Sequence, residues 1–171
     1  NARAAATSLG GGTAFVNGGR GSSPALPLTL APLPDGCGEA TAVARTSGTQ
    51  PEVVVATSCG PYVVTTASAT PFQAGLSPAS FPTTLAAHAG TIFGGTSTTG
   101  LWRFSGASWS AEPVAGDPGT GTVNAVRSFG GALWVALSVG LFTRGSGGWE
   151  DVSAGLPSSG LVVSLGGDAG A

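Results

Sequence analysis

Glycines at three positions spaced 40 residues apart divide this chain into similar units. Gly60, Gly100 and Gly140 each open a short phrase of apolar and aromatic residues, and Trp109 and Trp149 are separated by the same 40 residues. Self-similarity at a fixed period of this size is typical of repeat architectures, in which each repeat is one supersecondary unit. The spacing therefore predicts a repeat of about 40 residues.

Each unit contains short apolar runs separated by turn residues, which predicts β-strands. In the unit that starts at Thr122 the expected strands are 123–127, 132–137, 141–144 and 149–152. Earlier copies are expected at 84–87, 91–94, 101–104 and 108–111, at 41–44, 53–57 and 62–65, and, more divergently, at 5–9 and 13–16. We therefore expect residues 1–171 to form one domain, with units at about 5–39, 40–82, 83–121 and 122–160 and the start of a fifth at 161–171.

The composition favours an all-β fold. The 171 residues include 30 glycines and 12 prolines, 42% are hydrophobic and only 8% are charged. Gly and Pro break helices, and the apolar fraction is too high for a disordered chain. A four-stranded unit of about 40 residues is the blade pattern of a β-propeller, whose sheets bury both faces by packing against one another around an axis. A β-solenoid is the alternative, but its coils repeat at a shorter period and lack a regular pair of tryptophans.

The segment from Gly140 to Leu165 carries a recognisable phrase: glycine, leucine and an aromatic residue, then a tryptophan, then Gly-Leu-Pro-Ser-Ser-Gly-Leu-Val-Val-Ser-Leu. It resembles the repeats of bacterial sialidase-like and two-component-regulator-type propellers, and the resemblance implies a propeller fold over about two units. The Asp box of sialidase-like repeats, Ser-x-Asp-x-Gly-x-Thr-Trp, is degenerate here, because Phe104 and Arg144 occupy its aspartate position. The resemblance therefore implies the fold and the repeat class, and it carries over no catalytic residue.

The number of blades has two interpretations. Four units and a fragment are present, so the chain is either a four-bladed ring closed by its terminal strands or a portion of a larger ring. We favour the portion, because an open ring leaves unpaired strand edges that a partner or further chain must cover.

The charges exclude several classes of function. Six arginines, no lysine and eight carboxylates give a net charge of −2, and the arginines are scattered along the chain. A nucleic-acid surface needs clustered cations, and a Walker phosphate loop or a Schiff base needs a lysine. No run approaches the length of about 18 apolar residues that a membrane-spanning helix needs. We therefore expect no nucleic-acid partner, no membrane span and no cofactor.

Two cysteines, Cys37 and Cys59, lie 22 residues apart at different places in the repeat. A disulfide between them would stabilise the fold by about 3 kcal/mol in the chain-entropy model and would tie the first unit to the second. It would also indicate an extracytoplasmic location, periplasmic, cell-surface or secreted. The alternative is a pair of free, buried thiols. With one histidine and no Cys-x-x-Cys, a zinc site is not expected.

The candidate contact residues are one histidine and two tryptophans. His88 ends an expected first strand, where it can meet a ligand, although a solvated turn histidine is the alternative. Trp109 and Trp149 follow the period and so are interpreted as structural, which leaves Trp102 and Trp134 as the irregular pair. His88, Trp102 and Trp134 are therefore the predicted ligand or partner contacts.

The carboxylates do not form a convincing catalytic pair. Glycoside hydrolysis needs two carboxyl groups on either side of the bond. Asp117 lies in a Gly-Asp-Pro-Gly turn, Glu150 and Asp151 follow a tryptophan on an expected outer strand, and Asp168 is near the end of the chain. The single tyrosine, Tyr62, lies in an expected blade strand and not in a cluster of arginines. No catalytic, cofactor-binding or metal-binding residue is predicted.

These observations favour a non-enzymatic, extracytoplasmic β-propeller that acts as a rigid protein-binding or assembly scaffold. Its expected partner is another protein or further blades of the same protein. The alternative is a carbohydrate-active, glycoside-hydrolase-like or sugar-binding propeller, whose site is completed by residues outside this chain. Enzymatic activity is thus left open, with binding favoured.

Overall fold

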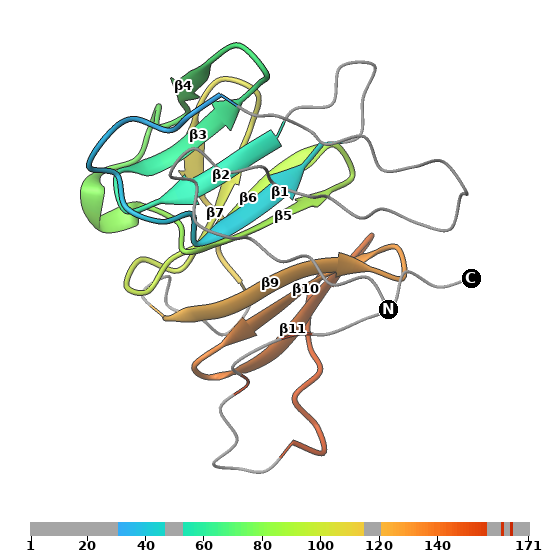
Figure 1. Cartoon of the computed structure of the whole chain (residues 1–171). Helices are drawn as coiled ribbons and strands as arrows, with labels where there is room; N and C mark the ends of the chain where they lie inside the picture. The colour runs from blue at the N-terminus through green and yellow to red at the C-terminus, as the bar shows by residue number, and fades with distance from the viewer. Residues whose placement is uncertain (1–30, 47–52, 115–120, 157–161, 163–164, 166–171) are drawn as a thin grey trace, which may run out of the picture.

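The computed structural model describes residues 31–46, 53–114, 121–156, 162 and 165, and within them it is an all-β structure (Figure 1). Twelve strands of the described residues form three antiparallel sheets of four strands each. The sheets have the orders β1-β2-β3-β4, β5-β6-β7-β8 and β9-β10-β11-β12, so each is a simple meander of consecutive strands. One 3₁₀ turn, η1 (Pro78–Ser80), links the first two sheets.

The strands have the following bounds. The first sheet contains β1 (Ala42–Arg45), β2 (Val53–Thr57), β3 (Gly60–Val64) and β4 (Ala69–Pro71). The second contains β5 (Thr84–His88), β6 (Thr91–Gly95), β7 (Leu101–Phe104) and β8 (Trp109–Ala111). The third contains β9 (Val123–Phe129), β10 (Ala132–Leu137), β11 (Gly140–Gly145) and β12 (Gly148–Asp151).

The sequence predictions agree with these strands at most positions. Strands were expected at 53–57, 101–104 and 132–137, and the structure has β2, β7 and β10 with those bounds. Eight further expected strands match within one or two residues at each end, whereas β4 was not expected. The strands expected at 5–9 and 13–16 lie outside the described residues, as does almost all of 161–171.

The three sheets stack face to face, with the second sheet in the middle. Alternate residues of its strands point to opposite sides: Leu85 and Ile92 join a core cluster with residues of β1 and β2, and Ala86 and Phe93 join a cluster with residues of β9, β10 and β11. This alternation is the period-two pattern of a strand buried on both faces. Gly95 permits the close approach, because a Cβ there would collide with Val123 of β9 and Thr84 of β5.

The first strands of successive sheets lie side by side, with β5 between β1 and β9 (Figure 1). The His88 imidazole Nδ1 at the end of β5 lies 2.9 Å from the Ser128 hydroxyl of β9. One unit further along the chain, Asn124 of β9 donates its side-chain N–H to the carbonyl oxygen of Val162 at 3.0 Å. Each of these two hydrogen bonds therefore joins the first strand of a sheet to a residue about 40 positions later in the chain.

The period-matched tryptophans connect neighbouring sheets. The Trp109 indole N–H donates to the carbonyl oxygen of Phe72 at 2.7 Å, and the Trp149 indole N–H donates to Glu112 Oε1 at 3.3 Å. Each bond reaches back 37 residues, into the segment that follows the preceding sheet's fourth strand. The interpretation of this pair as structural therefore agrees with their contacts.

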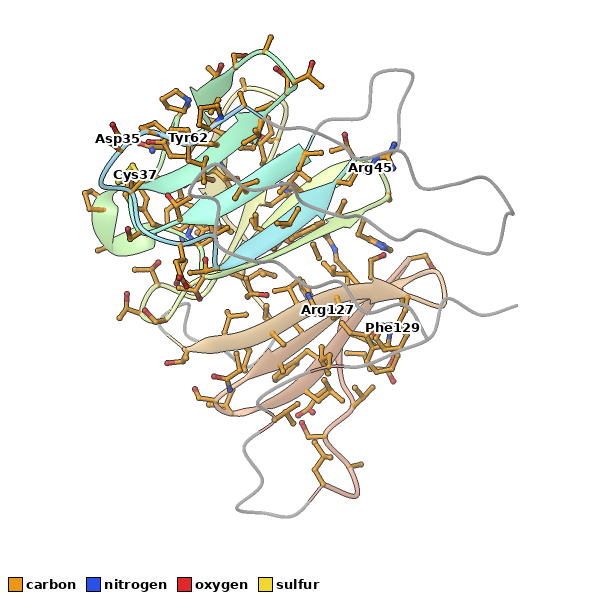
Figure 2. The ribbon with its side chains drawn as sticks, in the orientation of Figure 1. Asp35, Cys37, Arg45, Tyr62, Arg127 and Phe129 are labelled. Atoms are coloured by element: carbon orange, nitrogen blue, oxygen red, sulfur yellow. A yellow bond between two sulfur atoms is a disulfide. The ribbon has the colours of Figure 1, made fainter. Side chains whose placement is uncertain are left out.

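The segment that precedes β1 covers the outer face of the first sheet through a disulfide. Cys37 and Cys59 are bonded, with Cα atoms 5.0 Å apart, so the alternative of free thiols is excluded. Cys37 is buried among Val53, Val55 and Tyr62, and the Tyr62 hydroxyl lies 3.6 Å from its sulfur (Figure 2). Because a disulfide sulfur carries no hydrogen, the tyrosine is the donor. A disulfide of this kind is compatible with an extracytoplasmic location.

Among the described residues, the helical content is confined to one short turn. Within the ranges described above, no helix has the length and apolar character that crossing a membrane requires.

Candidate functional site

A pocket of about 360 Å³ lies where the second and third sheets meet. Both sheets contribute to its walls. The second sheet supplies residues of β5, β6, β7 and the β5–β6 turn, and the third sheet supplies residues of β11 and of the β9–β10 and β11–β12 turns. The lining residues are His88, Ala89, Thr91, Phe93, Arg103, Gly131, Arg144, Gly145 and Ser146.

Two hairpin turns of the same kind border the pocket. Ala89 and Gly90 connect β5 to β6, and Gly130 and Gly131 connect β9 to β10, and all four residues have positive φ angles. Positive φ at both central residues is what a type I′ hairpin turn requires. Ala89, with φ of 47°, is the one residue other than glycine with this conformation among those described. The tight turn places His88, the last residue of β5, at the pocket wall.

A carboxylate holds the two arginines of the pocket together. Glu112 follows β8 and is 9% exposed. Its Oε2 lies 3.2 Å from Arg103 Nε on β7, and its Oε1 lies 3.0 Å from a terminal nitrogen of Arg144 on β11. One carboxylate therefore bridges guanidinium groups from two different sheets.

Aromatic rings fix the orientation of the second guanidinium. The Arg144 guanidinium carbon lies 5.7 Å from the centroid of the Phe93 ring and 5.8 Å from that of the Trp149 ring. Both distances are within the range of cation–π attraction. Trp149 also donates its indole N–H to Glu112, so the ring and the carboxylate position the same arginine. Arg144 is thus held on three sides before any ligand arrives.

The charges of this cluster do not cancel. Arg103 and Arg144 carry two positive charges and Glu112 one negative charge, which leaves an excess of one positive charge at the pocket. None of the lining residues is a carboxylate, and His88 adds a third basic side chain to the wall beside the two arginines. The whole chain has a net charge of −2, so this is a local reversal of sign. A pocket with this charge can bind an anion.

Of the three predicted contact residues, only His88 lines the pocket. Trp102 packs beside the core cluster between the first two sheets and donates its indole N–H to Thr99 at 3.0 Å. Trp134 of β10 stacks on Phe129, the last residue of β9, with ring centroids 4.9 Å apart and planes 5° from parallel. Figure 2 places Phe129 and Arg127 on β9 of that sheet. The structure does not bring the two tryptophans together with His88.

The two described carboxylates that were considered for catalysis, Glu150 and Asp151, do not line the pocket. Glu150 and Asp151 are exposed on the edge strand β12, and Asp117 and Asp168 lie outside the described residues. The Ser153 hydroxyl, and then the Ser153 backbone N–H that donates to Asp151 Oδ1 at 2.8 Å, hold the pKa of Asp151 below its ordinary value. This is a turn-capping role after the strand. Three or more metal-ligating side chains are not gathered anywhere in the described part of the chain.

Sequence reasoning missed Arg103, Arg144 and Glu112 as a site. The available signal was an arginine near the end of the Gly-Leu-aromatic phrase in two successive units. No feature of the sequence distinguishes Glu112, because a carboxylate that follows a strand is ordinarily a solvated charge.

Comparison of the chain with protein-family models, with curated proteins and with solved structures finds no match. The function is therefore argued from the residues and their geometry.

We expect Glu112→Gln to lower the free energy of unfolding by about 1–2 kcal/mol. The change removes the charge that two guanidiniums share, and the effect is smaller than for a fully buried pair because Arg103 and Arg144 remain 41% and 30% exposed. Urea unfolding followed by tryptophan fluorescence measures it. Glu150→Gln, at an exposed edge position, is the matched control, and an equal loss in both variants would contradict a bridging role for Glu112.

Proposed function

We propose that the three sheets are blades of a β-propeller, a portion of a larger ring in an extracytoplasmic protein, and that it acts as a rigid, non-catalytic module that binds a partner protein. The side-by-side first strands and the face-to-face sheets support the blade assignment. The Asn124 bond to Val162 supports a further first strand beside β9. The disulfide supports an oxidising compartment.

The observation that carries the binding proposal is the bridged arginine pair beside the pocket. Arg103 and Arg144 come from two sheets and meet on one carboxylate that is 9% exposed. Holding two long cationic side chains in place before binding lowers the conformational entropy that a partner's arrival would otherwise cost. A charged pocket that is built on strands and has its cations already fixed suits recognition of a partner better than a mobile charged surface patch does.

The experiment compares wild-type protein with a variant whose pocket is filled. Ser146→Trp places a large ring at a lining position of the β11–β12 turn, and Ala107→Trp, in the corresponding turn between β7 and β8, is the matched control because Ala107 does not line the pocket. Each full chain is immobilised and used to capture proteins from an extract of the cells that produce it. We expect one protein to be captured by wild type and Ala107→Trp and lost with Ser146→Trp. Identical captured proteins for all three would refute binding through this pocket.

A further inference from the structure

We propose that the pocket lined by His88, Arg103 and Arg144 receives a carboxylate group of the partner protein, from an acidic side chain or a chain terminus. This inference rests on the proposed binding function and adds the chemistry that the site recognises.

The arginines keep hydrogen-bond donors available to a ligand. Arg103 faces Glu112 through Nε, which has no aligned hydrogen-bond partner, and 41% of the Arg103 side chain is exposed. Arg144 uses one terminal nitrogen for Glu112. A guanidinium presents five N–H donors in a planar fork that matches the two oxygens of a carboxylate. The unused edges of the two guanidiniums can therefore hold a second carboxylate.

The net charge of Arg103, Arg144 and Glu112 favours a ligand group with a single negative charge. Two guanidiniums and Glu112 sum to one positive charge, so one carboxylate brings the site to neutrality. A phosphate, which carries close to two negative charges near neutral pH, would leave the two arginines and Glu112 with a net negative charge. Glu112 itself demonstrates that a carboxylate fits between these two arginines with contacts of 3.0 and 3.2 Å.

The rest of the wall offers donors and space. Thr91 and Ser146 are polar residues of the lining, and His88 uses Nδ1 for Ser128, which leaves its other ring nitrogen for a ligand. Gly131 and Gly145 have no side chain to occupy the space. A volume of about 360 Å³ lies at the lower end of the range of about 300–1,000 Å³ that small-molecule sites occupy, which is enough for one side chain or a terminal residue.

The test uses the tryptophan indole N–H signals in a proton–nitrogen correlation spectrum of the full chain. The chain has four tryptophans. Trp149 reports on the site because its indole N–H donates to Glu112, and Trp109 is an internal control because its indole N–H donates to the Phe72 carbonyl. Trp→Phe variants assign the signals. The probes are glutamate blocked at both ends, N-acetylalanine, blocked glutamine and inorganic phosphate, all at one ionic strength.

We expect blocked glutamate or N-acetylalanine to shift the Trp149 signal saturably while Trp109 does not move. The tighter of the two identifies the side chain or the terminus as the source of the carboxylate. Blocked glutamine has the same shape without the charge and is expected to give no saturable shift. Saturation by neither acid, an equal response to blocked glutamine, or tighter binding of phosphate would each overturn the proposal.

Two variants test the position of the bound group. Arg103→Gln is expected to weaken blocked-glutamate binding about tenfold or more, because a charge-assisted hydrogen bond is lost. Ser146→Trp removes no ion pair, so it provides a second test if the arginine variant folds poorly. It is expected to abolish the shift of the Trp149 signal by blocked glutamate, whereas Ala107→Trp is expected to leave that shift unchanged. An undiminished shift in Ser146→Trp would overturn the proposal.

This experiment separates failure of the inference from failure of the proposed function. If no acid binds and the filled pocket still loses the captured protein, partner binding stands and the carboxylate assignment is wrong. If acids bind and the captured proteins are unchanged, the carboxylate site stands and partner binding through it is wrong.

Discussion

Leu133→Ala is expected to lower the free energy of unfolding by about 2–5 kcal/mol, the usual cost of deleting a fully buried leucine side chain. Leu133 is in β10, an inner strand of the third sheet, has no exposed surface and packs in the cluster that joins this sheet to the second. The substitution removes transfer free energy and leaves a cavity between two sheets that cannot easily collapse. Urea unfolding of the full chain measures the loss.

Leu156→Ala is the matched control for this prediction. Leu156 is 39% exposed in the turn that follows β12, so its removal should change stability little. A loss below about 1 kcal/mol for Leu133→Ala would contradict the face-to-face packing of the second and third sheets. Because the pocket lies between those sheets, such a result would also remove the physical basis of the binding site.

The strands could be predicted from the sequence because the 40-residue repeat and the turn residues are visible along the chain. Gly60, Gly100 and Gly140 begin or precede β3, β7 and β11, and each has a positive φ that favours glycine. The fourth strand of the first sheet was missed for an equally local reason. Ala69–Pro71 is three residues long, largely exposed and ends in proline, which strands tolerate only at an edge.

The candidate site could be predicted only in part from the sequence, because it depends on how the sheets face one another. His88 could be singled out as the sole histidine at a strand end, and it does line the pocket. Arg103 and Arg144 are 41 residues apart, and nothing local indicates that their side chains turn toward the same carboxylate. That contact follows from the stacking of two sheets. The repeat period predicts that the sheets stack, but it does not predict which side chains meet between them.

The tryptophans illustrate the same limit. Regular spacing groups Trp109 and Trp149, and both donate an indole N–H to the preceding unit. In the irregular pair, Trp102 donates its indole N–H within its own turn and Trp134 stacks on a neighbouring ring, and ligand contact by these two residues stays a prediction. A residue outside the repeat pattern can therefore still have a local packing role.

Replacing both Cys37 and Cys59 by alanine is expected to lower the free energy of unfolding by about 3 kcal/mol. The two residues are 22 apart, and their bond removes loop-closure entropy from the unfolded chain. The bond also keeps the segment before β1 on the outer face of the first sheet, where Cys37 is 5% exposed. Denaturant unfolding of the double variant against wild type, without reductant, measures the loss.

Reductant supplies the control that distinguishes the bond from the bulk of the two side chains. Wild-type protein unfolded with reductant should approach the stability of the double variant, while the variant should not respond to reductant at all. If the variant is far less stable than reduced wild type, the packing of Cys37 against Val55 and Tyr62 outweighs the cross-link. If oxidised wild type and the variant are equally stable, the segment before β1 does not depend on the disulfide to cover this sheet.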